Sequence, residues 1–154
     1  MELYLARHGE PKPEDEDPAR PLSERGRQEV ESAARAVVRL KPPPAAIWHS
    51  GKLRAKKTAE IFAEHLKPPQ GVQQVEGLAP MDDPQVAQRM VEERGEPIML
   101  VGHLPHLSRL ASLLLVGDAE REVVAFHTGG LVCLSHEKGH WWVRWLRSPE
   151  LAAE

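Results

Sequence analysis

The sequence has a single cysteine and no long apolar run, and these two shortages exclude whole classes of protein. Cys133 cannot form an internal disulfide, and its place in an apolar run, residues 131–134, predicts a buried thiol on a strand. The longest other apolar run, residues 110–116, is far shorter than the roughly 20 residues that cross a bilayer. We therefore expect no membrane-spanning helix.

The sequence also lacks a strong excess of charge of either sign. Its formal net charge is -3 at pH 7 with the histidines neutral, which argues against a broad nucleic-acid-binding surface. The first residues form an apolar strand, without the basic and apolar segments of a signal peptide. We expect a cytoplasmic protein with neither nucleic acid nor membrane as a partner, and the oligomeric state stays open.

The pattern of apolar residues indicates an α/β fold in one domain spanning residues 1–154. Strand-like runs alternate with segments of helical periodicity, and the last two runs follow each other directly. This order predicts a three-layer α/β/α sandwich, with a mostly parallel central sheet and a C-terminal antiparallel hairpin. The expected strands are residues 2–6, 45–48, 72–75, 97–101, 131–134 and 141–146, and the expected helices are residues 23–40, 52–66, 83–94 and 105–116, the first with Ser23 as its N-cap.

Basic and imidazole side chains follow three of the expected strands. Arg7 and His8 come after the first strand, Ser50 and Arg54 after the second, and His103 after the strand at 97–101. If these strands are parallel neighbours, the side chains meet at the carboxyl edge of the sheet, where α/β proteins bind ligands. Two guanidinium groups, two imidazoles and nearby helix N-termini favour an anion, and a phosphoryl group fits this set best.

Four motifs together resemble those of the histidine phosphatase superfamily, in the same order along the chain. They are Leu5-Ala6-Arg7-His8-Gly9-Glu10, Arg20-Pro21-Leu22-Ser23, Ser50-Gly51-Lys52-Leu53-Arg54-Ala55-Lys56-Lys57-Thr58-Ala59 and Val101-Gly102-His103-Leu104-Pro105. The short chain, the Gly-His-Leu-Pro turn and the later run Phe126-His127-Thr128-Gly129-Gly130 are most similar to the small SixA-type phosphohistidine phosphatases. The resemblance implies a phosphoglycerate mutase-like fold and a phosphatase activity.

The resemblance also assigns roles to four side chains. His8 would be the nucleophile that becomes phosphohistidine, Arg7 and Arg54 would hold the phosphoryl oxygens, and His103 would donate a hydrogen bond to them, in protonated form when phosphate is bound. Because His8 must offer a lone pair, we expect a backbone carbonyl to hold its other nitrogen. The scheme requires no metal or cofactor, and Arg7 and Arg54 would repel a cation from the His103-x-x-His106 spacing.

Further residues are weaker candidates for phosphate binding. Arg20 would either reach the phosphate or pair with the acidic loop at 14–17. Ser50 would either bind phosphate or cap the helix that follows it. Thr128 and Gly129 are candidate pocket residues, because they belong to the late Gly-rich run.

Larger relatives carry a carboxylic acid, in a mid-chain segment, that protonates the leaving oxygen. The candidates here are Asp82, Glu76 and Glu10, and the sequence does not choose among them. A site without a dedicated acid should favour N–P bonds and activated esters over plain alkyl phosphates, because an imidazole leaves more readily than an alkoxide.

The resulting prediction is a metal-independent phosphatase that acts through a covalent phosphohistidine on His8. The expected substrate is phosphohistidine on a protein. A small phosphorylated metabolite, as the substrate of a phosphomonoesterase or a mutase, is the alternative within the enzyme class. A phosphate- or phosphoprotein-binding module without turnover is the alternative outside that class, and His8 argues against it because binding alone needs no nucleophile.

Overall fold

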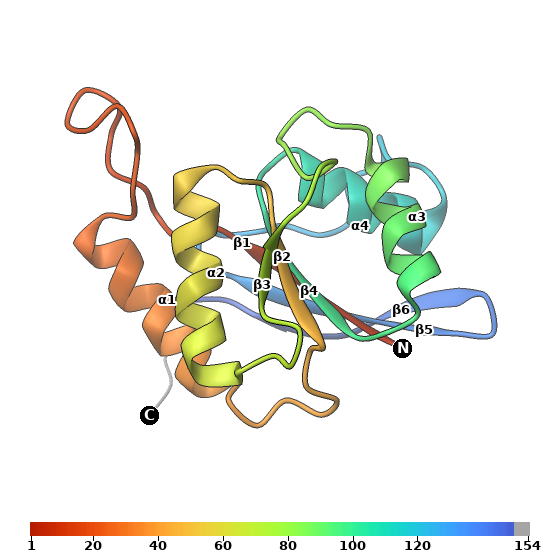
Figure 1. The fold of residues 1–154 in the computed structure, drawn as a ribbon. Coiled ribbons are helices and arrows are strands. Elements are labelled where there is room, and N and C mark those ends of the chain that lie inside the picture. Colours follow the sequence, from red (N-terminus) through yellow and green to blue (C-terminus); the bar gives the residue numbers. More distant parts are fainter. Residues whose placement is uncertain (150–154) are drawn as a thin grey trace.

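The computed structural model describes residues 1–149 and consists of a six-stranded sheet between two pairs of helices (Figure 1). Helices α1 (Glu24–Ala36) and α2 (Leu53–Leu66) cover one face of the sheet. Helices α3 (Pro84–Arg94) and α4 (His106–Val116) cover the other face. The predicted three-layer sandwich is confirmed, and the last five residues of the expected domain lie outside the described residues.

The sheet is mixed, with its parallel part in the centre and at one edge. Its strand order is β3-β2-β4-β1-β5-β6, and the first four strands in this order are parallel. Strands β5 and β6 form an antiparallel hairpin that adds to β1, as predicted. The strands are β1 (Glu2–Arg7), β2 (Ala46–His49), β3 (Val72–Gln74), β4 (Ile98–Gly102), β5 (Leu131–Glu137) and β6 (His140–Arg147).

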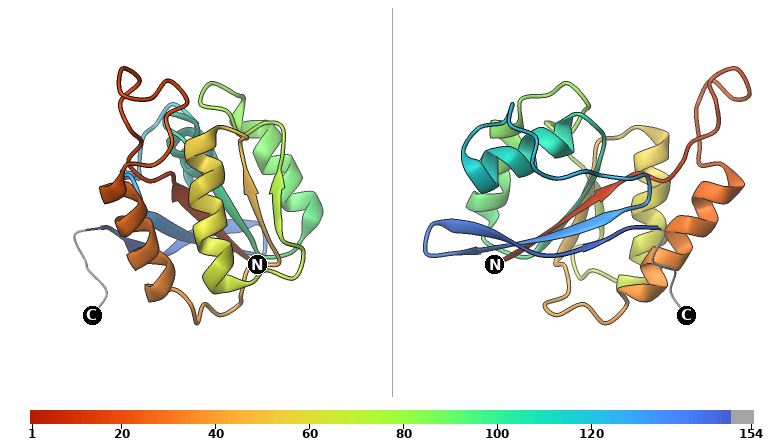
Figure 2. Two further views of the ribbon diagram at one scale, coloured as in Figure 1. Left: turned by 60° about the vertical axis from the view of Figure 1, so that its left-hand side comes forward. Right: turned by 180° about the vertical axis from the view of Figure 1, so that it is seen from behind.

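Strand β1 contributes side chains to the cores on both faces of the sheet. Leu3 and Leu5 pack on the α3/α4 side, whereas Tyr4 and Ala6 pack on the α1/α2 side, and all four are fully buried. A strand that is covered on both faces has no polar side, which is why residues 3–6 of β1 form an unbroken apolar run in the sequence. The segment between α4 and β5 crosses the α3/α4 side, as the view from behind shows (Figure 2).

The first helix has the predicted start but ends earlier than predicted. The Ser23 hydroxyl accepts a hydrogen bond from the Gly26 N–H at 3.0 Å, so Ser23 is the N-cap. The helix ends at Ala36, since Val37 has non-helical backbone angles (φ -111°, ψ 16°). The three prolines at 42–44 are the sequence signal for the end of this helix, but they lie beyond a turn that already follows it. No helix within residues 1–149 is long and apolar enough to span a membrane.

The N-terminus of α1 lies directly against the segment that follows β1. The Ser23 hydroxyl lies 2.8 Å from Oε1 of Glu10, and the Ser23 N–H donates to the Glu10 carbonyl at 2.9 Å. A Cβ on Gly26 would collide with that carbonyl and would lie 2.8 Å from the Glu10 nitrogen. The helix therefore needs glycine at position 26 for close approach, although glycine weakens a helix.

We expect Gly26→Ala to destabilise the protein by about 1–3 kcal/mol, because the new methyl group meets backbone that cannot move aside as a side chain would. Urea unfolding monitored by circular dichroism measures the difference. Gln28→Ala, an exposed substitution in the same helix, should change the unfolding free energy by less than about 0.5 kcal/mol. Equal stabilities for the two variants would contradict the close approach.

Candidate active site

The side chains expected to meet at the sheet edge do meet there. Strands β2, β4 and β1 are neighbours and run parallel, so their carboxyl ends lie at one edge. The His8 N–H donates to the Gly102 carbonyl at 3.0 Å, which ties the residue after β1 to the end of β4. The rings of His8 and His103 lie 5.0 Å apart between centroids. Arg54 is close enough to both rings that its charge lowers the pKa of each.

His8 has one ring nitrogen held and the other available. Its Nδ1 lies 2.7 Å from the Gly9 carbonyl oxygen. A carbonyl can only accept, so Nδ1 carries the proton and the neutral ring keeps its lone pair on Nε2. Burial, together with the positive charges of Arg54, Arg7 and Arg20, lowers the pKa of His8 to about 4, against the opposing effect of the Gly9 carbonyl. The ring is therefore an unprotonated nucleophile at neutral pH.

Arg7 has a buried guanidinium donor without a partner. Its Nη1 donates to the Phe126 carbonyl at 3.0 Å. Its Nε is buried, and no atom of residues 1–149 accepts a hydrogen bond from it. Burial lowers the pKa of Arg7, which shows that the charged form is held there at a cost. An anion at this edge would satisfy the free donor.

Two further arginines stand near His8. Burial, and then the charge of Arg20, lowers the pKa of Arg54, so the two guanidinium groups are near each other. Arg20 lies in the segment between β1 and α1, has a left-handed backbone (φ 51°) and donates from Nε to the Lys12 carbonyl at 3.3 Å. Its charge lowers the pKa of both His8 and Arg54, so it lies within electrostatic range of the two. Phosphate binding by Arg20 stays a prediction.

Ser50 and His103 form a direct pair. The Ser50 Oγ lies 2.6 Å from His103 Nε2, and it also accepts from the Lys52 N–H at 3.3 Å. The expectation that Ser50 caps the following helix is wrong, because the N-cap of α2 is Lys52 and no side chain caps this helix. Phosphate binding by Ser50 stays a prediction. Burial and the nearby charges of His8, Arg54 and Lys52 lower the pKa of His103 to about 3. His103 is neutral in these surroundings, and a phosphate anion in contact with the ring would favour its protonated form.

The late Gly-rich run supports the site through its backbone. The Gly129 N–H is shared between the carbonyls of Arg7 and His8, both at 3.1 Å, and Gly129 has a left-handed backbone (φ 72°). The Thr128 side chain borders a shallow hollow with Arg25 and Glu29 on the α1 side. Phosphate binding by Thr128 and Gly129 stays a prediction.

The three candidate acids have different surroundings. Asp82 accepts from the Ala79 N–H at 3.0 Å, and its charge raises the pKa of the buried His106. Glu10 is bonded to the Ser23 hydroxyl at 2.8 Å. Glu76 is exposed. The carboxylates of Asp82 and Glu10 thus already accept hydrogen bonds from neighbouring groups of the protein.

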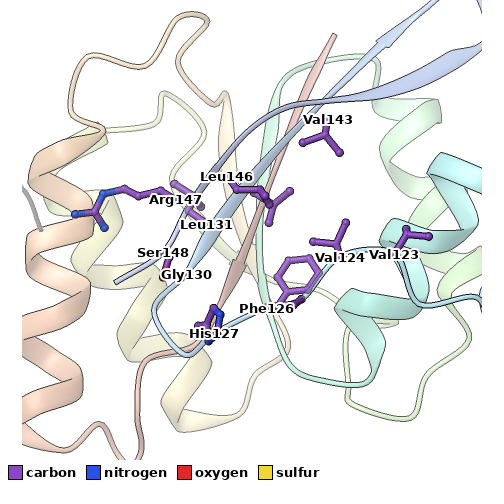
Figure 3. Close-up of a pocket in the computed structure, with 12 residues that line it drawn as sticks. Val123, Val124, Phe126, His127, Gly130, Leu131, Val143, Leu146, Arg147 and Ser148 are labelled. Atoms are coloured by element: carbon purple, nitrogen blue, oxygen red, sulfur yellow. The ribbon is translucent and has the colours of Figure 1, made fainter. Parts of the chain in front are cut away.

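An apolar hollow of about 340 Å³ lies beside this cluster (Figure 3). The side chains of Val124, Phe126, Val143 and Leu146 gather around it, and Leu146 is 56% exposed. The hollow shares Phe126 with the site, because the Phe126 carbonyl accepts from Arg7. It is a neighbour of the cationic cluster and not its centre.

Comparison with known proteins identifies the family. The sequence model of the histidine phosphatase superfamily (branch 1) matches residues 3–89, more than half of the chain. The chain belongs to the histidine phosphatase superfamily. The family match covers the segments that carry Arg7, His8 and Arg54, whereas His103 lies beyond it. A search of curated proteins gave no match.

Solved structures of several phosphatases share the fold. The protein histidine phosphatase SixA complexed with tungstate is 23% identical, with a TM-score of 0.84 over 97% of both chains. A phosphoserine phosphatase mutant from Entamoeba histolytica in complex with phosphoserine is 16% identical, with a TM-score of 0.72 over 97% of this chain and 98% of that one. A mycobacterial glucosyl-3-phosphoglycerate phosphatase is 19% identical, with a TM-score of 0.72 over 96% and 99%. At these identities the likeness establishes the fold.

One polar residue of the site was not singled out in the sequence. Thr58 is fully buried in α2 and accepts a hydrogen bond from the Gly9 N–H at 3.0 Å. The sequence could have indicated this role, because Thr58 follows Arg54 by one helical turn. It lies on the buried face of the helix, together with Ala55 and Phe62. Within residues 1–149, no group of three or more His, Cys, Asp or Glu side chains is placed to hold a metal ion.

The buried histidines make stability depend on pH. The pKa of His103 in the folded protein, about 3, lies below its ordinary value of 6.5, so the unfolded chain binds more protons between these values. The contribution of His103 is complete above pH 6.5 and is lost as pH falls, by about 2 kcal/mol between pH 7 and pH 5. We expect His103→Asn to lose correspondingly less stability over this range. Urea unfolding at pH 7, 6 and 5 measures the loss, and parallel curves for the two proteins would refute the assignment.

Proposed function

We propose that this protein is a metal-independent phosphatase that transfers a phosphoryl group to His8 and then to water, with phosphohistidine on a protein as its substrate. Two features together carry the proposal. His8 keeps a free lone pair on Nε2, and the buried Nε–H of the adjacent Arg7 has no acceptor within residues 1–149. One group offers electrons to phosphorus, and the other offers a hydrogen bond to its oxygens.

In the first step His8 Nε2 attacks phosphorus. The N–P bond to His8 forms while the bond from phosphorus to the substrate nitrogen breaks, and its electron pair leaves with that nitrogen. A substrate imidazole whose other nitrogen is protonated leaves as a neutral ring, so it needs no acid. Arg7, Arg54 and His103 would surround the phosphoryl oxygens, whose charge is spread in the transition state. The Gly9 carbonyl stabilises the positive charge that develops on the His8 ring.

In the second step water attacks phosphorus of the phosphohistidine. The P–N bond breaks, its electron pair returns to His8 Nε2, and the proton that the water gives up passes to solvent as inorganic phosphate forms. The same three cationic or donor groups serve both steps because the phosphoryl oxygens stay in place. Positioning and charge neutralisation are the main requirements of phosphoryl transfer, and side chains of this chain can supply both.

Two features support a protein as the substrate. Between α2 and β4 the chain forms β3 and α3, short elements that leave little to build a lid over the site. The carboxylates Asp82 and Glu10 are bonded to other groups, which favours a leaving group that departs without a strong acid. The structural neighbour SixA is a protein histidine phosphatase, while the Entamoeba neighbour holds phosphoserine, so the fold itself accommodates both classes.

We expect His8→Ala to lower turnover of p-nitrophenyl phosphate by at least about a thousandfold, because the nucleophile is removed. The wild-type protein should form an acid-labile, base-stable phosphorylated species, detectable by ³¹P NMR after rapid quench in base. His140→Ala, at the exposed start of β6, is the matched control and should retain turnover. Phosphate binding by a wild-type protein that shows no turnover would instead identify a binding module.

We expect a protein phosphohistidine and p-nitrophenyl phosphate to be hydrolysed with kcat/KM at least about a hundredfold above that of sugar phosphates, the factor that a missing general acid costs. Asp82→Asn should leave the phosphohistidine rate nearly unchanged. Equal kcat/KM values across the panel would remove the argument for a protein substrate and favour a small-molecule phosphomonoesterase.

A further inference from the structure

The hydroxyl of Thr58 joins the two chain segments that carry His8 and Arg54. Thr58 lies in the second turn of α2 and is fully buried. Its Oγ1 accepts from the Gly9 N–H at 3.0 Å and donates to the Arg54 carbonyl at 2.8 Å. Both capacities of the hydroxyl are therefore used, one on each segment.

Gly9 carries this connection to the nucleophilic ring. Its N–H is held by Thr58, and its carbonyl accepts from His8 Nδ1 at 2.7 Å. A Cβ on Gly9 would lie 2.7 Å from Val30 Cγ2, so the residue is also pressed against α1. A continuous line of short hydrogen bonds thus runs from the His8 imidazole through Gly9 and Thr58 to the backbone of Arg54.

The other backbone hydrogen bonds around His8 lead elsewhere. The His8 N–H reaches Gly102 at the end of β4, and the carbonyls of Arg7 and His8 accept from Gly129. Among the hydrogen bonds of residues 7–9 in the part of the chain that the structure describes, only the one to Thr58 reaches α2. The helix that holds the Arg54 guanidinium is therefore fixed to the nucleophile loop by this hydroxyl.

Resting on the proposed function, we propose that Thr58 is a positioning residue that sets the His8 imidazole relative to the Arg54 guanidinium for transfer. It does not touch the phosphoryl group. Phosphoryl transfer depends on in-line placement, and a displacement of about 1 Å costs on the order of a hundredfold in rate. Valine has the shape of threonine without the hydroxyl, so it would preserve packing and release the loop from α2.

The test separates the rate of phosphoryl transfer from binding and from folding. Rapid-mixing measurements of the p-nitrophenolate burst give the rate constant for phosphorylation of His8, with active sites counted from the burst amplitude. We expect Thr58→Val to lower this rate constant at least about tenfold with little change in KM, because Arg7 and Arg54 remain to bind the substrate. We expect Thr58→Ser, which keeps the hydroxyl, to stay within about threefold of the wild type.

The control is Ser112→Ala, which removes a fully buried hydroxyl from α4, away from the site. Its burst rate should equal that of the wild type, although its stability can change. If Thr58→Val does not fold, the comparison of Thr58→Ala with Thr58→Ser decides by the same criterion. A wild-type burst rate in the variants without the hydroxyl, or equal slowing in Thr58→Ser, would overturn the inference. Failure of the proposed function would show differently, as turnover in His8→Ala or as no release of p-nitrophenolate by the wild type.

Discussion

The arrangement of this protein depends on holding positive and potentially positive groups together at one edge of a sheet. Arg7 and Arg54 are partly buried, both lower the pKa of the buried His8, and Arg54 also lowers that of the buried His103. Burial and mutual repulsion both disfavour charge there, which is why the pKa values of His8 and His103 fall to about 4 and about 3. Under the proposed function, a bound phosphoryl group would offset the repulsion among these groups and favour the protonated form of His103.

The backbone holds these groups in place against that repulsion. The carbonyl of Gly9 fixes the tautomer of the His8 ring, and the carbonyl of Gly102 accepts from the His8 backbone N–H. The Gly129 N–H donates to the carbonyls of Arg7 and His8. Backbone groups at strand ends are rigid and uncharged, so they orient the side chains without neutralising them. A carboxylate in their place would also orient Arg7, but it would neutralise the positive charge on which the proposed phosphoryl transfer depends.

Most of the fold was predictable, because the relevant signals are local. Buried parallel strands are short apolar runs, and Ser23 and Asp83 accept from the helix N–H groups that follow them as N-caps should. The end of α1 was misjudged because the prolines at 42–44 are a stronger sequence signal than the turn that begins at Val37. The need for Gly26 was invisible, since it comes from Glu10 on another segment.

The sequence by itself determined the chemistry of the site. It fixed that Arg7, His8, Arg54 and His103 follow strands, and strand ends in a parallel sheet share an edge. Only the tertiary structure decided how each group is bonded: that His8 keeps Nε2 free, that Ser50 pairs with His103, and that Thr58 ties Gly9 to α2. The reason is physical. Which residue types occur, and in what order, is written along the chain, whereas a hydrogen bond between residues 49 positions apart depends on distances that exist only after the sheet and helices have packed.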